Sequence, residues 1–464
     1  MRNLIVIILL LFTVVTNAQT SLNMSLAYQW NDSSLPSSFA HDNTYNEIWG
    51  YEKNGREYAI IGTTVGTHIF DITDVNNVDT VDFIPGRVQG GQIIHRDYDT
   101  YQDYLYIVCD EGASSLQIAD LTFLPDSAPL VYDDNALIIK SHNIFIDTAS
   151  GLLYTCAGET NLGNNDLSIY SLAGNPTNPQ FLLNCSNDVP FWNSTIGNVH
   201  DIYVRNDTAY CNAGMNGLFV VDFTNISNAQ LIGSLTNYVQ QDYNHSGWLH
   251  SSGSYYALAD EDHGKDVKII DVSDLSNMTV IDTIGSNVVQ SLSIPHNLIF
   301  YGDNLYMSYY FDGVYVFNTS DVNNISLAGY YDTSTRPHQD GVYQGCWGVY
   351  PFLPSGKILA SDMQEGLFVF DVTFPTGVNE NEFTSEFAFI VYPNPTSSVI
   401  TITTTLFENS VSFSIIDING KVVKEGQLTR AQTSLNVDNL STGVYSLTLI
   451  QQNGKVTSKK FIKR

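Results

Sequence analysis

The sequence predicts an all-β protein, a seven-bladed β-propeller followed by a small Ig-like β-sandwich. Three observations lead to this prediction. Aromatic residues make up 12% of the 464 residues and charged residues only 14%, which suits strands and turns better than helices. A unit of about fifty residues recurs seven times before residue 375. The C-terminal residues 391–464 then form a separate series of alternating strands.

The repeat is visible as a short apolar strand that ends in a polar residue. Successive copies of this residue are separated by 49, 51, 51, 49, 47 and 53 positions. The seven residues are Asp71, Asp120, Ser171, Asp222, Asp271, Asn318 and Asp371. Near-constant spacing of this kind is the signature of a repeat architecture.

Each unit divides into four short strands, expected in the sixth unit at 296–302, 304–310, 313–318 and 325–331. Four strands per unit at this period indicate propeller blades, because a parallel β-helix has a much shorter repeat and a helical solenoid a 3.6-residue periodicity.

Closure of the ring is predicted from the two ends of the repeat region. The seventh unit lacks an outermost strand, and residues 22–30 resemble the outer strands of other units. We therefore expect residues 22–30 to pair with residues 367–372, which also hides a sheet edge that would otherwise favour aggregation.

The N-terminus has the pattern of a secretory signal peptide. Arg2 supplies a positive charge, residues 4–15 are apolar, and residues 16–18 offer a small-residue cleavage site. Twelve apolar residues are too few to span a bilayer, and no transmembrane segment follows. The predicted organisation is a signal peptide at 1–18, the propeller at 19–374, a linker at 375–390 and a C-terminal domain at 391–464.

Charge separates the two predicted domains. Residues 391–464 hold 8 Lys and Arg against 4 acids, whereas the rest of the chain holds 11 basic and 44 acidic residues. An acidic propeller repels phosphate backbones, so nucleic acid is not expected as a partner. The 5 cysteines have no CxxC spacing, which excludes a dense disulfide scaffold and a typical zinc motif, although one disulfide of unknown pairing is compatible with export.

Several segments of the propeller resemble a known family. Residues 47–74, 141–147, 199–204, 244–249, 295–300 and 346–372 are similar to the choice-of-anchor B proteins, which are relatives of LVIVD-repeat propellers. The segment WGVYPFLPSG (347–356) is especially specific. The resemblance covers roughly residues 40–373 and implies a secreted or surface propeller without a defined activity.

The C-terminal domain carries a second resemblance. VYPNPTSSVITI (391–402), IIDINGKVVKEG (415–426) and residues 438–464 resemble the type A sorting domain of the type IX secretion system of Bacteroidota. This implies handling by that secretion machinery and a location outside the cell, on the surface or released. From the residues themselves, Asn419-Gly420 and Asn453-Gly454 predict two-residue hairpin turns within a small sandwich.

Histidines recur at the start of the innermost strand of consecutive blades. This position is occupied, in order, by Asn46, Arg96, His142, His200, His245, His296 and Cys346. Equivalent inner-strand starts surround one end of a propeller channel, so His142, His200, His245 and His296 should face a shared space near Asp97, Asp201 and Glu47. Two interpretations are open: the imidazoles hydrogen-bond neighbouring blades, or they bind a divalent transition metal or polar ligand.

Two further sets of residues are candidates for ligand binding. Trp49, Trp248 and Trp347 are expected at the same channel end, where they either stack on a sugar or peptide or pack between blades. Carboxylates in the loops after the second strands offer oxygen ligands for Ca²⁺, although without the spacing of an EF-hand. These acidic residues are Asp110, Glu111, Glu159, Asp260, Glu261, Asp262, Asp312 and Asp362.

No motif of a common enzyme class is present, since GxSxG, HExxH, GxxxxGK and a GxGxxG that follows a strand are all absent. The sequence favours an exported surface protein that binds a glycan, peptide or partner protein. The alternative is a metal-dependent hydrolase or lyase with the four histidines as ligands and Asp201 as base. A purely structural adhesin is a third hypothesis.

Overall fold

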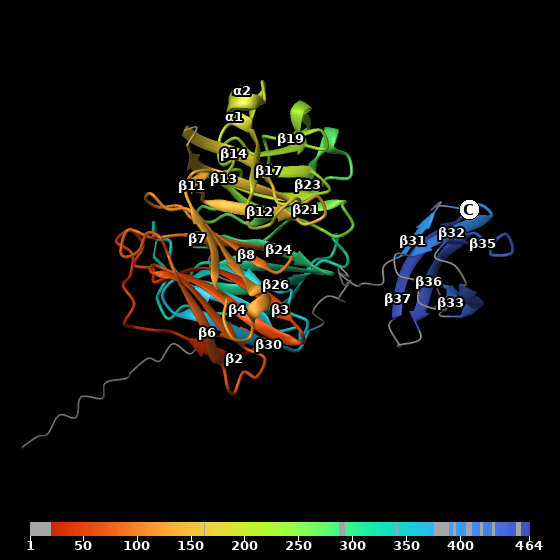
Figure 1. The fold of residues 1–464 in the computed structure, drawn as a ribbon, viewed down its shortest axis with the longest axis horizontal. Coiled ribbons are helices and arrows are strands. Elements are labelled where there is room, and N and C mark those ends of the chain that lie inside the picture. The colour runs from red at the N-terminus through yellow and green to blue at the C-terminus, as the bar shows by residue number, and fades with distance from the viewer. Residues whose placement is uncertain are drawn as a thin grey trace, which may run out of the picture. The chain divides into compact units, whose positions relative to one another are not determined.

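The computed structural model describes residues 20–161, 163–286, 293–339, 341–374, 389–392, 396–404, 411–417, 421–428, 432–451 and 456–464. The predicted signal peptide and most of the predicted linker lie outside these residues. The predicted all-β class is confirmed, and the chain divides into two compact units, residues 1–378 and 379–464 (Figure 1). No helix within the described residues is long and apolar enough to cross a bilayer.

Seven antiparallel sheets follow one another within residues 20–374, and we number these blades 1 to 7 along the chain. Blade 1 consists of β3 (Tyr45–Lys53), β4 (Arg56–Thr63), β5 (Gly66–Asp71) and β6 (Asp79–Pro85). Blade 2 consists of β7 (Arg96–Tyr101), β8 (Tyr104–Cys109), β9 (Leu116–Asp120) and β10 (Leu130–Asp134). Blade 3 consists of β12 (Asn143–Asp147), β13 (Leu152–Thr160), β14 (Gly163–Ser171) and β15 (Gln180–Asn184), with β11 (Ile138–Lys140) added beside β13.

Blade 4 consists of β16 (Asp201–Arg205), β17 (Thr208–Asn212), β18 (Leu218–Asp222) and β19 (Gln230–Leu235). Blade 5 consists of β20 (Asn244–Leu249), β21 (Tyr255–Asp260), β22 (Val267–Asp271) and β23 (Thr279–Ile284). Blade 6 consists of β24 (Leu298–Tyr301), β25 (Asn304–Tyr309), β26 (Gly313–Asn318), β27 (Ser326–Tyr331) and the added β1 (Ser21–Leu22). Blade 7 consists of β28 (Cys346–Tyr350), β29 (Ile358–Asp362), β30 (Gly366–Val372) and β2 (Met24–Trp30). The helices are single turns, α1 (Cys185–Asp188), α2 (Trp192–Thr195), η1 (Leu121–Phe123), η2 (Ile226–Asn228) and η3 (Leu275–Asn277).

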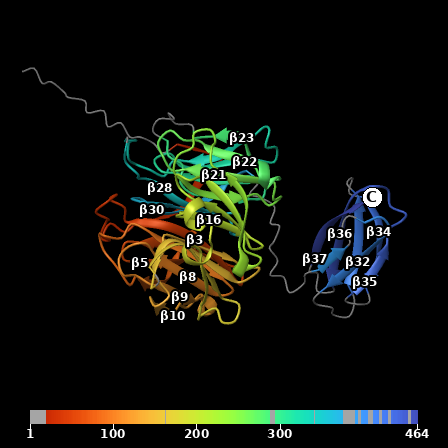
Figure 2. The ribbon, with the colours of Figure 1, turned by 90° about the horizontal axis from the view of Figure 1, so that it is seen from above.

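The inner strands of the blades form a closed ring around a central channel. Figure 2 shows the blades from a second direction. Each inner strand contacts the inner strand of the next blade, and β28 of blade 7 returns to contact β3 of blade 1. The hydrophobic core lies between adjacent blades, as where Ile60 and Ile69 of blade 1 pack with Leu105 and Ile107 of blade 2. A blade cannot bury both of its faces alone, so closure of the ring completes the core.

The predicted closing strand is confirmed. β2 pairs antiparallel with β30, with Met24 opposite Val372 and Trp30 opposite Leu367. The structure adds a contact that was not predicted, because β1 pairs with β27 of blade 6. The N-terminal segment therefore joins two blades.

The polar residue that revealed the repeat has a defined structural role. In several blades its side chain accepts a hydrogen bond from the backbone N–H two residues further on, as Asp222 does from Thr224 (2.8 Å) and Asp271 from Ser273 (2.9 Å). Such Asx turns end the third strand and direct the chain toward the fourth. This role explains why Asp or Asn recurs at this position.

The described residues of the C-terminal unit form two sheets. One contains β31 (Phe389–Tyr392), β32 (Val399–Thr404) and β35 (Gln432–Asn436), and the other contains β33 (Val411–Asp417), β34 (Val422–Leu428), β36 (Gly443–Gln451) and β37 (Val456–Lys463). Ile400 and Ile402 of the first sheet share a core with Phe413, Ile415 and Leu447 of the second, as in a β-sandwich. The two predicted Asn-Gly turns lie outside the described residues.

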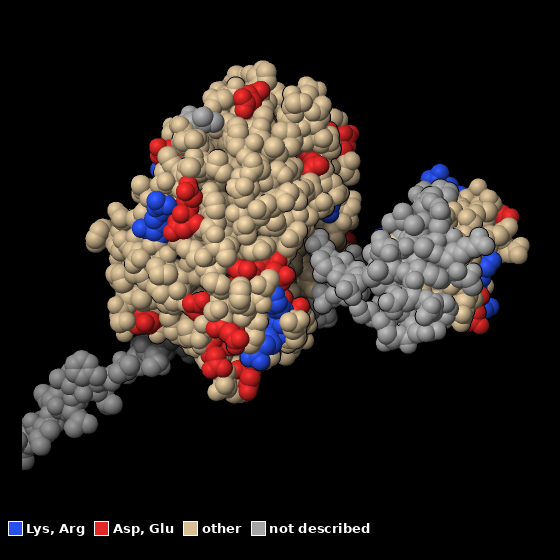
Figure 3. Space-filling model, in the orientation of Figure 1, with Lys and Arg blue, Asp and Glu red and all other residues tan. Residues whose placement is uncertain are grey.

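Acidic side chains dominate the charged surface of the propeller. On the face shown in Figure 3, Asp and Glu are spread over the propeller and Lys and Arg gather at only a few places. Cys109, Cys156, Cys185, Cys211 and Cys346 are buried free thiols.

Candidate metal centre in the central channel

Five imidazoles and one indole form a closed circle inside the channel. Neighbouring ring centroids are 4.4 Å apart for His95 and His142, 4.1 Å for His142 and His200, and 4.2 Å for His200 and His245. The circle continues from His245 to His296 at 4.4 Å, from His296 to Trp347 at 4.6 Å, and from Trp347 back to His95 at 5.2 Å. We call these six residues the imidazole ring.

The start of each inner strand places these side chains. His95, His142 and His200 immediately precede the first residue of β7, β12 and β16. His245 and Trp347 occupy positions where the strand register shifts, within β20 and β28. A β-bulge turns a side chain away from its regular direction, which here brings two more rings into the channel.

The four predicted histidines therefore converge, but two other sequence expectations are wrong. Blade 2 contributes His95 and not Arg96, whose guanidinium donates to the carbonyls of Thr63 (2.9 Å) and Val88 (2.7 Å). The three tryptophans do not lie in one layer: Trp347 belongs to the imidazole ring, whereas Trp49 and Trp248 line a cavity in the channel.

Hydrogen bonds fix the tautomers of two ring histidines. His200 Nδ1 lies 3.2 Å from the carbonyl oxygen of His245, and His296 Nδ1 lies 2.5 Å from that of Trp347. Because a carbonyl only accepts, each Nδ1 carries the hydrogen and each Nε2 keeps its lone pair. These bonds link neighbouring blades, as one sequence interpretation expected, and they also leave a nitrogen available for a metal.

His245 has an unsatisfied nitrogen. Its side chain is buried, and its Nδ1 has no hydrogen-bond partner among the described residues. Its Nε2 lies 3.7 Å from Glu261 Oε2. A buried polar atom without a partner is costly, and at functional sites it often marks the place of a ligand.

Burial keeps most of the ring imidazoles neutral. It lowers the pKa of His296 to about 3, against the effect of its bond to the Trp347 carbonyl. Burial followed by repulsion from neighbouring imidazoles holds the pKa of His95, His200 and His245 well below the usual value. Neutral imidazole is the form that binds metals.

His142 differs from the other ring histidines. Burial lowers its pKa, but the hydrogen bond and negative charge of Asp110 outweigh burial and raise the pKa overall. The two residues are 2.9 Å apart between His142 Nδ1 and Asp110 Oδ2.

The acidic loop residues do not gather into one oxygen site as a Ca²⁺ centre would require. Asp110 and Glu261 contact the imidazole ring. Asp260 instead forms a fully buried ion pair with Lys268 at 2.6 Å, and Asp362 accepts a hydrogen bond from Thr333. These carboxylates thus have separate partners in different blades.

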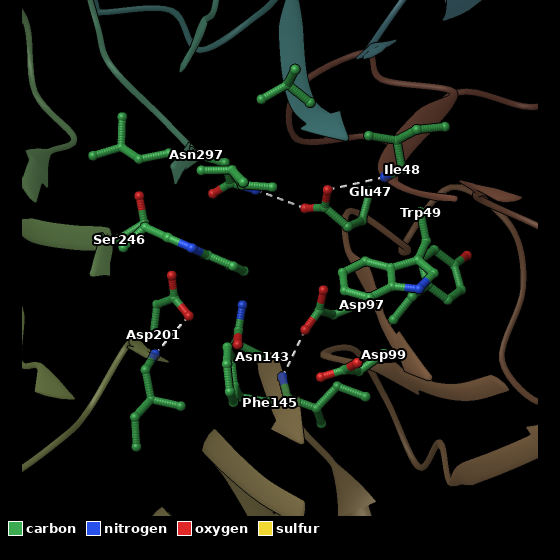
Figure 4. A pocket seen from close by; sticks show the side chains of 18 residues that line it. Glu47, Ile48, Trp49, Asp97, Asp99, Asn143, Phe145, Asp201, Ser246 and Asn297 are labelled. Carbon is green, nitrogen blue, oxygen red and sulfur yellow. Dashed lines mark hydrogen bonds between the residues drawn. The ribbon is translucent and has the colours of Figure 1, made fainter. Parts of the chain in front are cut away.

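A cavity lies in the channel beside the ring, bordered by polar side chains of successive blades (Figure 4). Glu47 accepts from Asn297 Nδ2 (2.8 Å), Asp97 from the Ile144 N–H (2.7 Å) and Asp201 from the Ile202 N–H (2.6 Å). Burial raises the pKa of Glu47 and of Asp201 to about 7 and, together with the charge of Glu47, raises that of Asp97. The cavity volume is about 80 Å³, well below the roughly 300 Å³ at which pockets for drug-sized ligands begin.

Three groups of side chains among the described residues have the geometry to bind a cation. Within each group, one ligand atom of every member lies within 4.8 Å of the others. The groups are His142, His200 and His245; His245, Glu261 and His296; and Glu47, His95 and Asp97. Sequence reasoning found the first group but missed His95.

The comparisons with known proteins concern mainly the tail and the fold. Residues 390–464 match the family model of the secretion system C-terminal sorting domain. Such a tail implies handling by the type IX secretion system and export to the outer surface or the medium. No curated protein matches the chain in sequence.

The chain is also similar to solved structures at low identity. PorZ, an essential bacterial surface component of the type IX secretion system of Porphyromonas gingivalis, is 12% identical with a TM-score of 0.45, and the match covers 94% of this chain and 61% of that protein. The Cps50 (Swd1) β-propeller domain from Myceliophteria thermophila is 11% identical with a TM-score of 0.49, over 75% of this chain and 100% of that domain. The computationally designed Ika8 protein is 9% identical with a TM-score of 0.43, over 73% of this chain and 99% of that protein.

Proposed function

We propose that this chain is an exported surface propeller that binds a divalent transition-metal ion in its channel through the imidazole ring. One observation carries the proposal: single ligand atoms of His142, His200 and His245 lie within 4.8 Å of one another. Three imidazoles are a typical ligand set for Zn²⁺, Cu²⁺ or Ni²⁺ and leave a coordination position open.

A purely structural role accounts less well for the ring. Hydrogen bonds to neighbouring blades use Nδ1 of His142, His200 and His296, and His95 Nδ1 lies 3.3 Å from His142 Nδ1. Among the described residues, none of these bonds uses a nitrogen of His245. Several buried imidazoles that face one another without a cation leave lone pairs unsatisfied, which costs free energy. A bound metal ion would satisfy them.

A glycan or peptide fits the channel poorly. A cavity of about 80 Å³ has room for an ion with a few water molecules, not for a sugar residue or a peptide side chain with its backbone. A macromolecular ligand would therefore contact the outer faces of the propeller, and its binding would not depend on the ring histidines.

A metal-dependent hydrolase or lyase is the second candidate, favoured by Asp201. Its partly buried carboxyl lines the cavity and lies next to the proposed ligand His200 in sequence, a position suited to a general base. If the metal-loaded protein cleaves an ester in a chromogenic panel, Asp201→Asn should abolish cleavage while metal content is retained.

Metal analysis of the mature chain tests the proposal. After removal of metals with a chelator and reloading with Zn²⁺, elemental analysis should find at least one zinc per chain. The double variant His200→Ala/His245→Ala should lose the ion bound by the ring and bind Zn²⁺ at least about 100-fold more weakly, because even loss of an outer partner costs 10–100-fold.

The matched control replaces two histidines outside the channel, His68→Ala/His250→Ala, and should retain the wild-type zinc content. Equal zinc in the wild type and the ring variant, or none in the wild type, would contradict the proposal.

A further inference from the structure

A second group of potential ligands lies beside the imidazole ring. Glu47 of blade 1 and His95 and Asp97 of blade 2 place one ligand atom each within 4.8 Å of the others, and all three side chains are buried. The group shares no residue with His142, His200 and His245, so both groups can be occupied at the same time. His95 and His142 connect them, with 3.3 Å between their Nδ1 atoms.

The two carboxyl groups have no cationic partner. No Lys or Arg forms an ion pair with Glu47 or Asp97 in the described part of the chain. Arg96, between His95 and Asp97 in sequence, directs its guanidinium to backbone carbonyls instead. Buried carboxylates are normally paired or coordinate a metal, and here protein side chains supply no pairing.

Hydrogen bonds orient both carboxyl groups before any ligand arrives. Glu47 accepts from the Ile48 N–H (3.0 Å) and from Asn297, and Asp97 accepts from the Ile144 N–H. The donors are backbone or amide groups without net charge, so they leave the charge of an ionised carboxylate to be balanced by a cation. Both side chains border the cavity in Figure 4, which provides space for water or a small ligand on a bound ion.

We propose that Glu47, His95 and Asp97 hold a second divalent metal ion next to the ion of the imidazole ring, so that the channel contains a two-metal centre. The inference rests on the proposed function only in that this function supplies the neighbouring ion, since the second ion has its own three ligands. Two carboxylates and one imidazole form a harder ligand set than three imidazoles, and they also offset the charge of two adjacent cations. Paired ions of this kind hold and polarise small oxygen ligands.

Zinc stoichiometry of the full mature chain tests the second site. The wild type, stripped and reloaded with Zn²⁺ alone, should bind two ions per chain. The variant Glu47→Gln/Asp97→Asn should bind one, His200→Ala/His245→Ala should bind one, and the combined variant none.

The matched control is Asp99→Asn. Asp99 is a buried carboxyl on the same strand that borders the same cavity but belongs to none of the three groups, so its variant should still bind two ions. Loss of one ion in this control as well would contradict the assignment to Glu47 and Asp97.

Cu²⁺ loading tests the second site on the wild-type protein, so the result does not depend on whether the Glu47→Gln/Asp97→Asn variant folds. Two adjacent Cu²⁺ ions couple magnetically, so the fully loaded wild type should show a weakened electron paramagnetic resonance signal per copper relative to the half-loaded protein. One ion per chain in the wild type, with an uncoupled spectrum, would overturn the second site and leave the ring proposal intact. No bound ion at all would overturn both.

Discussion

At the scale of single residues, His68 provides a test of burial that is independent of the channel. It lies on β5 between Trp30 and Phe83, with ring centroids 4.8 and 4.5 Å away, and its buried Nε2 has no partner in the described chain. Burial lowers its pKa to about 4. The unfolded chain therefore binds this proton first, and His68 destabilises the fold as the pH falls from 6.5 toward 4.

The substitution His68→Phe should remove this acid sensitivity. Relative to the wild type, the variant should gain roughly 1–2 kcal/mol of stability at pH 5 beyond any difference that it shows at pH 8, where His68 is neutral in both states. Urea unfolding at the two pH values measures this difference. An identical change at both pH values would contradict the prediction.

The candidate site was predictable from sequence wherever the repeat kept its register. His142, His200, His245 and His296 each precede an Asn, Asp or Ser that begins the polar layer of the cavity, so their alignment was visible. Blade 2 has one additional residue at this point, and Arg96 separates His95 from Asp97. A one-residue difference of this kind changes which side chain faces the channel, and only the three-dimensional structure reveals it.

At the scale of elements, β2 is the part of the fold that was predicted most specifically. Its identification depended on a missing outer strand in the seventh repeat and on the resemblance of residues 22–30 to other outer strands. The pairing of β1 with β27 was not predictable, because two residues carry too little pattern to identify a strand. The C-terminal strands were predictable as alternating segments, but their assignment to two sheets required the coordinates.

Trp30 at the end of β2 should stabilise the closed ring. Its ring centroid lies 4.8 Å from that of Phe70 and 5.5 Å from that of Tyr45, so it connects the closing strand of blade 7 to blade 1. Because Trp30 is partly buried, Trp30→Ala should cost about 2–4 kcal/mol. Deletion of residues 20–31 should cost more.

Thermal unfolding checks this prediction. Ser25, on the same strand, has an exposed side chain, and Ser25→Ala should leave the melting temperature within about 1 °C of the wild type. An unchanged melting temperature after deletion of residues 20–31 would mean that the ring does not need its closing strand.

At the scale of the whole molecule, the chain combines an acidic propeller with a basic sorting tail. The tail has its own core, separate from the cores of the blades. Since the sorting tail directs export and all proposed metal ligands belong to the propeller, the two functions should be separable.

Deletion of residues 390–464 should therefore leave the melting temperature and the zinc content of the propeller unchanged. The truncated protein should accumulate on the periplasmic side of the outer membrane. Protease treatment of intact cells measures the loss of surface exposure, because only protein on the cell surface is digested. Elemental analysis of the purified variant measures its zinc content. Loss of zinc without the tail would show that the channel depends on the C-terminal unit, and normal surface exposure would show that export uses another signal.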